Sequence, residues 1–154
     1  MLSQSDLQTW QNLNIKDICG CGYINNSFNH CAHFVAHVLG YEFGYTCKQA
    51  TGKGSPGATL RVNEIFNECR DVGKWDSLPA GTVSCLAFVT AAGHVNLADG
   101  RMSDHPQKHI GIYCNGTIWH YSNSRKKVWT ATPNDFKHHY PGADITVYYG
   151  EFPV

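Results

Sequence analysis

The sequence predicts an α+β domain in which helices come first and an antiparallel β-sheet follows. Apolar residues recur at helical spacing in the first half of the chain, and runs rich in β-branched and aromatic residues dominate the second half. The Asn115-Gly116 pair separates two of these runs and is a strong signal for a tight hairpin turn. Helices followed by consecutive strands are typical of α+β folds, so we expect N-terminal helices packed on one antiparallel sheet.

Three segments of the first half carry the helical pattern. Residues 5–18 predict a short helix with its apolar side chains facing inward. Residues 31–39 (CAHFVAHVL) predict a second helix, with Asn29 as its N-cap and Gly40 as its C-terminal stop. Residues 60–70 predict a third helix, because their apolar residues again follow a helical period.

Five strands are predicted in the second half, each a short run of β-branched and aromatic residues. They are residues 83–90, 110–114, 117–122, 127–131 and 145–152. The segment 91–108 is long and polar and contains Gly, His and Asp residues. We therefore expect a functional loop there rather than a strand.

Size and composition limit the classes of protein to which the chain can belong. A chain of 154 residues predicts one domain spanning 1–154, and its 42% hydrophobic and 16% charged residues argue against disorder. Basic and acidic side chains balance at 12 each, which argues against a nucleic-acid partner. No apolar run approaches the roughly 20 residues of a transmembrane segment. The start, MLSQSDLQTW, has no secretory signal, so we expect the chain to be cytoplasmic as made.

The cysteines favour a reduced protein. Their number is odd, so at least one is free, and their spacings include no C-x2-C pair typical of zinc sites. A cysteine bridge between Cys19 and Cys21, or one longer bridge, stays open for a protein that works outside the cell. The seven cysteines are Cys19, Cys21, Cys31, Cys47, Cys69, Cys85 and Cys114.

Cys31 is the candidate nucleophile because it lies in the first turn of the predicted helix 31–39. Unpaired N–H groups and the helix dipole favour an anion there, so we expect a lowered Cys31 pKa. His109 begins one strand and His120 lies near the end of the next, and the hairpin joins them. We expect the two imidazoles at equal distance from the turn, to within one position, and close together on one face. A Cys-His-His triad is then geometrically reasonable.

Other interpretations of these residues stay open. A cysteine in an apolar helix is more often inert core, and a lone histidine on a strand is more often structural. His30, His33 and His37 fall on one face of the predicted helix, and His33 and His37, at i and i+4, can ligate zinc. The H-E-x-x-H pattern of zinc peptidases is absent. A zinc-binding regulatory domain is thus an alternative, while our expectation is no metal and no cofactor.

Four short motifs follow one another along the chain: residues 29–35 (NHCAHFV), 78–83 (LPAGTV), 109–113 (HIGIY) and, after a turn, 118–120 (IWH). Together they resemble the NlpC family of papain-like cysteine peptidases. Residues 29–35 resemble the start of the family's nucleophile helix, and 78–83 resemble its strand entry. Residues 109–113 resemble its histidine strand, and 118–120 resemble the strand of its third catalytic residue. The resemblance extends over roughly residues 20–152.

This resemblance implies a papain-like fold and a hydrolase that cleaves the stem peptides of bacterial peptidoglycan. By position, Cys31 resembles the nucleophile, His109 the general base and acid, and His120 the orienting residue. Tyr23 resembles a tyrosine of the family's oxyanion and substrate site, and the Cys31 backbone N–H would be the other oxyanion donor. The family's Asp, Ser and Gly around the nucleophile are replaced by His30, Ala32 and His33, and the missing carboxylate removes an anchor for a free amine.

The same resemblance suggests a biological setting and two further alternatives. A small hydrolase without an export signal fits an antibacterial toxin delivered by a specialised secretion system, with an immunity or delivery protein as partner, or a lysin released by lysis. An acyltransferase, deamidase or thioesterase acting on a protein or lipid is the first alternative. A non-catalytic binding module is the second.

Overall fold

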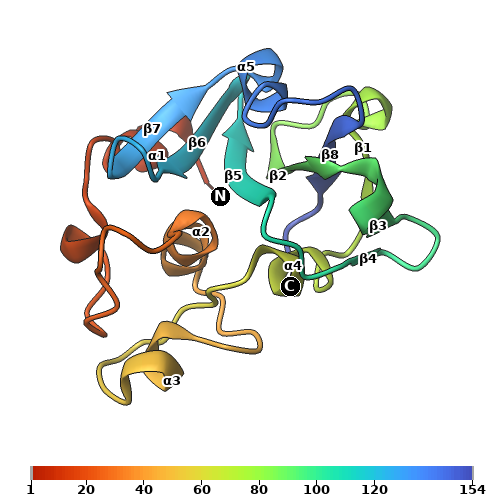
Figure 1. Cartoon of the computed structure of the whole chain (residues 1–154). Coiled ribbons are helices and arrows are strands. Elements are labelled where there is room, and N and C mark those ends of the chain that lie inside the picture. The colour runs from red at the N-terminus through yellow and green to blue at the C-terminus, as the bar shows by residue number, and fades with distance from the viewer. Residues whose placement is uncertain (1, 154) are drawn as a thin grey trace.

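A computed structural model describes residues 2–153 and confirms the α+β class (Figure 1). Six antiparallel strands form the main sheet in the order β1-β8-β2-β5-β6-β7. These strands are β1 (Val72–Lys74), β2 (Ser84–Ala91), β5 (Lys108–Cys114), β6 (Thr117–Ser122), β7 (Lys127–Ala131) and β8 (Ile145–Gly150). The helices are α1 (Gln4–Gln8), α2 (Cys31–Leu39), α3 (Cys47–Thr51), α4 (Val62–Phe66) and α5 (Pro133–Lys137), with short 3-10 turns at Ile15–Asp17, Trp75–Ser77 and Ala92–His94.

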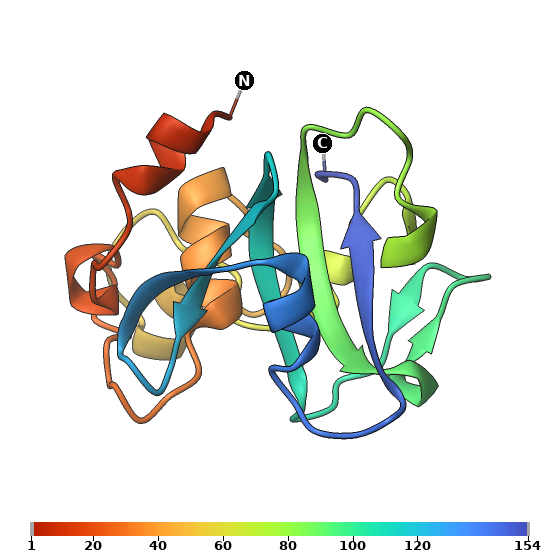
Figure 2. The same cartoon turned by 90° about the horizontal axis from the view of Figure 1, so that it is seen from above.

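Both faces of the sheet are covered, which explains why its central strands read as continuous apolar runs. The larger apolar cluster lies between the sheet and α2 with α4, and the smaller one lies beneath α5. Figure 2 shows α2 and α5 on opposite sides of β5 and β6. Successive residues of β5 and β6 therefore point alternately toward α2 and toward α5.

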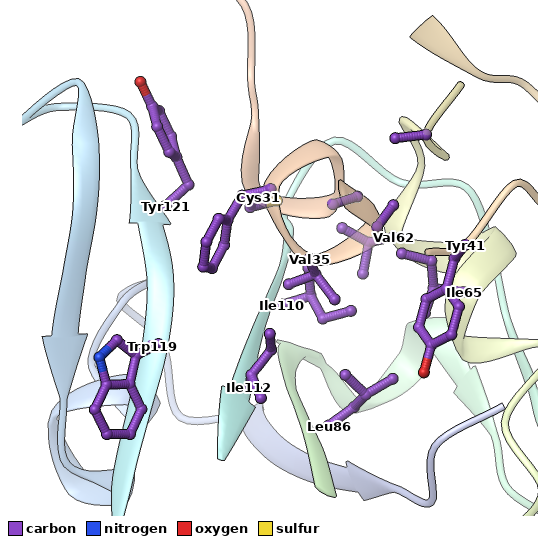
Figure 3. Packing of buried hydrophobic residues seen from close by; sticks show 14 of the residues in the cluster. Cys31, Val35, Tyr41, Val62, Ile65, Leu86, Ile110, Ile112, Trp119 and Tyr121 are labelled. Atoms are coloured by element: carbon purple, nitrogen blue, oxygen red, sulfur yellow. The ribbon is translucent and has the colours of Figure 1, made fainter. Parts of the chain in front are cut away.

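Helix α2 has the bounds that its sequence pattern predicts, and it packs on the middle of the sheet. Val35 lies over Ile110 and Ile112 of β5 within the larger apolar cluster (Figure 3). The N-cap is His30 and not the predicted Asn29, although the Asn29 side chain accepts a hydrogen bond from the Cys31 N–H at 3.0 Å. Gly40 ends the helix in the left-handed region that favours glycine, with φ 76°.

The hairpin between β5 and β6 is formed as predicted. Asn115 and Gly116 both have positive φ, 49° and 90°, as a two-residue turn of type I′ requires. Cys114 pairs with Thr117 next to the turn, and the ladder continues to the pair Ile112 and Trp119. This turn sets which residues of the two strands lie opposite each other.

Several local predictions differ from the structure. Residues 5–18 do not form one helix, because the chain turns at Asn12 (φ 69°) between α1 and the turn Ile15–Asp17. Of the third predicted helix, residues 60–70, only α4 (Val62–Phe66) is α-helical. Segment 91–108 is more than a loop, since β3 (Val95–Asn96) and β4 (Arg101–Met102) pair within it. The elements α3, α5 and β1 were not predicted, since each is three to five residues long and carries too short a pattern.

The helices are short throughout. Within residues 2–153, none has the length and apolar character that crossing a bilayer requires.

The two hairpin strands approach each other closely at Gly111 of β5. A Cβ at this position would lie 2.5 Å from Ile118 Cγ2 and 2.9 Å from the Trp119 carbonyl oxygen. We expect Gly111→Ala to lower the free energy of unfolding by about 1–3 kcal/mol, as overpacking does. Gly93→Ala is the matched control, because a Cβ there has no atom within 4 Å. Urea denaturation measures both, and equal stability of the two variants would contradict the close approach.

Candidate functional site

Two buried histidines on adjacent strands contact each other as the sequence predicts. His109 Nε2 of β5 and His120 Nδ1 of β6 are 2.9 Å apart, a hydrogen-bond distance. His109 has no exposed surface and His120 is 7% exposed. One imidazole therefore orients the other inside the protein, which is the relation between a catalytic base and its orienting group.

The pairing of these histidines is diagonal, which corrects the expectation of nearly equal distances from the turn. Continuing the ladder beyond Ile112 and Trp119 places Gly111, not His109, opposite His120. A Cβ on Gly111 would lie 3.2 Å from His120 Cβ. The missing side chain at Gly111 thus leaves room for the His120 ring to lean toward His109, a role that the sequence analysis missed.

The remaining ring nitrogen of His109 has no partner. Within the described part of the chain, His109 Nδ1 is buried and makes no hydrogen bond. Burial, followed by the nearby His139 and His120, holds the pKa of His109 well below its ordinary value of 6.5. The imidazole is consequently neutral near pH 7, and its Nδ1 is a proton acceptor in the tautomer whose Nε2–H donates to His120.

The Cys31 thiol lies beside the residue that follows His109. Cys31 is buried at the start of α2, and the backbone of Ile110 lies close enough to its sulfur to favour the thiolate. Burial raises the Cys31 pKa to about 11, against the expectation of a lowered pKa, because desolvation outweighs the backbone donors around the sulfur. Among the described residues, no hydrogen bond joins the Cys31 thiol to His109.

Both groups that the sequence analysis assigned to the oxyanion site have other contacts in the structure. The Cys31 N–H donates to Asn29 Oδ1. The Tyr23 ring packs edge-on against His30 and His33, with centroids 5.7 and 5.4 Å apart. Tyr23 therefore lies on the His30–His33 side of α2.

The segment after α5 covers the histidine pair. The His139 ring stacks on His109 with centroids 3.9 Å apart and planes 9° from parallel. Phe136 of α5 lies 5.5 Å from His109 and 5.8 Å from His120, between ring centroids. Phe136 and His139 therefore cover the histidine pair.

A second cluster lies on α2 and the loops around it. Ligand atoms of Cys19, His33, His37 and Cys47 all lie within 4.8 Å of one another. His33 and His37 were named as possible zinc ligands from their spacing, but His30, the third expected ligand, is not in the cluster. The two cysteines were missed because they come from separate loops. The Thr46–Gln49 capping box, which starts α3 at Cys47, is the local signal that could have drawn attention to Cys47.

Hydrogen bonds hold the members of this second cluster. His30 Nδ1 lies 3.0 Å from His33 Nδ1, and His30 Nε2 lies 2.7 Å from the Asn25 carbonyl oxygen. The Cys21 N–H donates to Cys19 Sγ at 3.3 Å, and the Ala58 N–H donates to Cys47 Sγ at 3.2 Å. All seven cysteines are unpaired, so the four donors are free to act as metal ligands.

Helix α2 therefore carries residues that suit two different kinds of site. The start of the helix carries a thiol close to Ile110, and the residue before Ile110 is the oriented, neutral His109; a thiol and an imidazole are the groups that acyl transfer uses. The middle of the helix carries two histidines that meet two cysteines, which suits a transition metal. Comparisons with protein-family models, with curated proteins and with solved structures gave no match, so both assignments depend on the chemistry of these residues.

Proposed function

We propose that this protein is a cysteine-dependent hydrolase that cleaves amide bonds, with Cys31 as nucleophile, His109 as general base and acid, and His120 as the orienting residue. The observation that carries the proposal is the state of His109. Its Nε2 is engaged by His120, and its buried Nδ1 has no partner among the described residues. The Cys31 thiol of α2 lies close to the backbone of Ile110, the residue that follows His109 in β5.

The protonation states define the course of the reaction. Cys31 is a thiol and His109 is a neutral base, so the proton moves during attack instead of resting on an ion pair beforehand. Sγ bonds to the carbonyl carbon while His109 Nδ1 takes the thiol proton and its Nε2–H donates to His120. Collapse of the tetrahedral intermediate breaks the C–N bond, and Nδ1 returns the proton to the leaving amine. Water then hydrolyses the thioester, which releases a carboxylic acid and restores the thiol.

Substrate entry requires the cover of the site to move. Cys31 and His109 are buried, and His139 lies flat on the His109 ring. The covering residues belong to the segment between β7 and β8, which contains only the five-residue helix α5. Such a short segment is a reasonable lid, because few buried side chains hold it.

The substrate class comes from the resemblance of the sequence motifs to NlpC-type peptidases. It implies the stem peptides of peptidoglycan, with delivery as an antibacterial toxin or release as a lysin. A deamidase, acyltransferase or thioesterase would use the same thiol and imidazole on a protein or lipid. A non-catalytic module would not need an imidazole with one nitrogen oriented and the other kept free.

Digestion of purified peptidoglycan sacculi tests the proposal directly. We expect the wild-type protein to release peptide fragments, identified by mass spectrometry, and Cys31→Ala to release none, because the nucleophile is gone. Cys85→Ala is the matched control, since Cys85 is equally buried but lies in β2. Equal digestion by wild type and Cys31→Ala would overturn the nucleophile. Digestion by neither would exclude peptidoglycan as the substrate.

The orienting role of His120 is tested by two substitutions of similar size. In Asn, the side-chain oxygen takes the place of His120 Nδ1 and still accepts the hydrogen bond from His109. In Leu, no acceptor remains. We expect His120→Leu to lower kcat/KM by about 10²–10⁴-fold and His120→Asn to retain most of the activity. Equal loss in both variants would show that the hydrogen bond is not what His120 contributes.

The pKa of His109 gives a pH prediction that needs no substrate. His109 faces His120 on β6 and His139 after α5, and Lys108 precedes it in β5. Because its folded pKa is lowered, His109 should stay neutral as the pH falls through 6.5, whereas the unfolded chain takes up the proton. Stability should therefore decrease as the pH drops below 6.5.

His139→Ala is the informative variant for this titration. It removes the stacked ring, so the His109 pKa should rise toward its ordinary value. NMR titration of the imidazole C–H signals measures the change, with His138→Ala as the exposed neighbouring control. An unchanged His109 midpoint in His139→Ala would contradict the covering role of His139.

A further inference from the structure

We propose that Cys19, His33, His37 and Cys47 form a structural zinc site that fastens the N-terminal loop and α3 to helix α2. This inference is independent of the hydrolase proposal, because it concerns different side chains and a different readout. It differs from the zinc alternative raised by the sequence, which used His30 as a ligand.

The spacing of the donor atoms fits a tetrahedral ion. Zinc bound to nitrogen at about 2.0–2.1 Å and to sulfur at about 2.3 Å places two nitrogens about 3.3 Å apart, and a nitrogen and a sulfur about 3.6 Å apart. His33 Nε2 and His37 Nε2 are 3.2 Å apart, and Cys47 Sγ lies 3.8 Å from His37 Nε2. These two distances approach the edges of the required tetrahedron, and all the donor atoms lie within 4.8 Å of one another.

Hydrogen bonds prepare His33 as a ligand. The Asn25 carbonyl oxygen can only accept, so His30 Nε2 carries a hydrogen and donates to it at 2.7 Å. In neutral His30 the Nδ1 is then an acceptor, and it receives the hydrogen of His33 Nδ1 at 3.0 Å. Neutral His33 therefore presents a bare Nε2 to the cluster. Such a partner on the second ring nitrogen accompanies most histidines that ligate metals.

The hydrogen bonds of the sulfur atoms distinguish Cys19 and Cys47, the proposed ligands, from the neighbouring Cys21. Cys19 Sγ and Cys47 Sγ each accept a backbone N–H hydrogen bond, from Cys21 and Ala58 respectively, so both sulfurs are placed as acceptors. The neighbouring Cys21 instead donates its thiol hydrogen to the Pro56 carbonyl oxygen at 3.3 Å. Cys21 is therefore held as a thiol outside the four donors, although it lies only two residues from Cys19.

The donor set indicates a structural and not a catalytic ion. Two cysteines and two histidines fill all four positions of a tetrahedral zinc ion, and no position remains for water or substrate. Three of the four ligands are buried, and His37 is half-buried. A closed site of this kind contributes its binding free energy to folding.

The segments that carry the cysteine ligands have few other contacts to hold them against α2. Cys47 is the only buried residue of the five-residue helix α3, so this helix has almost no apolar surface to hold it. Figure 1 shows α3 away from the main sheet, with α2 between them. The segment that carries Cys19 is likewise without a long helix or strand. An ion bound by both segments and by two side chains of α2 would join all three.

Metal analysis of the full-length chain tests the site. The protein is purified under reducing conditions without chelator, and its zinc is measured by plasma mass spectrometry. We expect one equivalent of zinc. Cobalt(II) added to the chelator-stripped protein should give the intense d–d bands of a tetrahedral ion and a thiolate-to-cobalt charge-transfer band. Zinc should raise the Tm of the stripped protein, because it binds the folded chain.

Two cysteine variants locate the ion. Cys47→Ser should lose its zinc on dialysis and show about half the charge-transfer intensity, since one of two thiolate ligands is gone. Cys21→Ser is the matched control and should keep one equivalent of zinc. If Cys47→Ser fails to fold, the cobalt spectrum and zinc-dependent Tm of the wild type still decide the question.

Three results would overturn the proposal. The first is a wild-type protein that gives no tetrahedral cobalt spectrum. The second is loss of zinc from Cys21→Ser to the same degree as from Cys47→Ser. The third is an intact mass lower by two hydrogens with Cys19 linked to Cys47, which would mean a disulfide in place of a metal. None of these outcomes affects hydrolysis by Cys31, so the two proposals fail separately.

Discussion

The packing of α2 against β5 and β6 is the contact on which both candidate sites depend. Val35 of α2 covers Ile110 and Ile112, and this apolar contact sets the distance between the helix and the strands. The start of the helix is fixed further by Asn123, which accepts a hydrogen bond from the His30 N–H and donates one to Asn29 Oδ1. Cys31 follows these residues, so its position relative to β5 is determined by the core and by the turn after β6.

Burial decides the chemical character of the proposed catalytic site. A thiolate and an imidazolium would each lose hydration at this depth, so the neutral thiol and neutral imidazole are the stable pair. Desolvation at the start of α2 is stronger than the attraction of the helix dipole, which is weak by comparison. The same burial makes every hydrogen bond within the site stronger once a substrate develops charge there.

The sequence predicts elements whose determinants are local. The bounds of helix α2 and the Asn115-Gly116 hairpin are predicted correctly because apolar spacing, the Gly40 stop and the turn residues lie within a few positions of one another. The contact of His109 with His120 follows from that hairpin, but its diagonal geometry depends on the space at Gly111. The raised Cys31 pKa and the meeting of Cys19 with Cys47 depend on tertiary packing, which no local pattern encodes. The stacking of the His139 ring on His109 also depends on tertiary packing.

Alternation along β5 has a consequence for how the chain can vary. His109 faces the α5 side and Ile110 faces α2, so adjacent residues belong to the histidine pair and to the larger apolar cluster. Adding one residue to the turn at Asn115 would shift β6 against β5 and move every β6 side chain to the opposite face. His120 would enter the core, and Tyr121 would leave it. The length of this turn therefore determines which face of the sheet each β6 side chain occupies. Related chains should differ in the lengths of their other loops before they differ in the length of this turn.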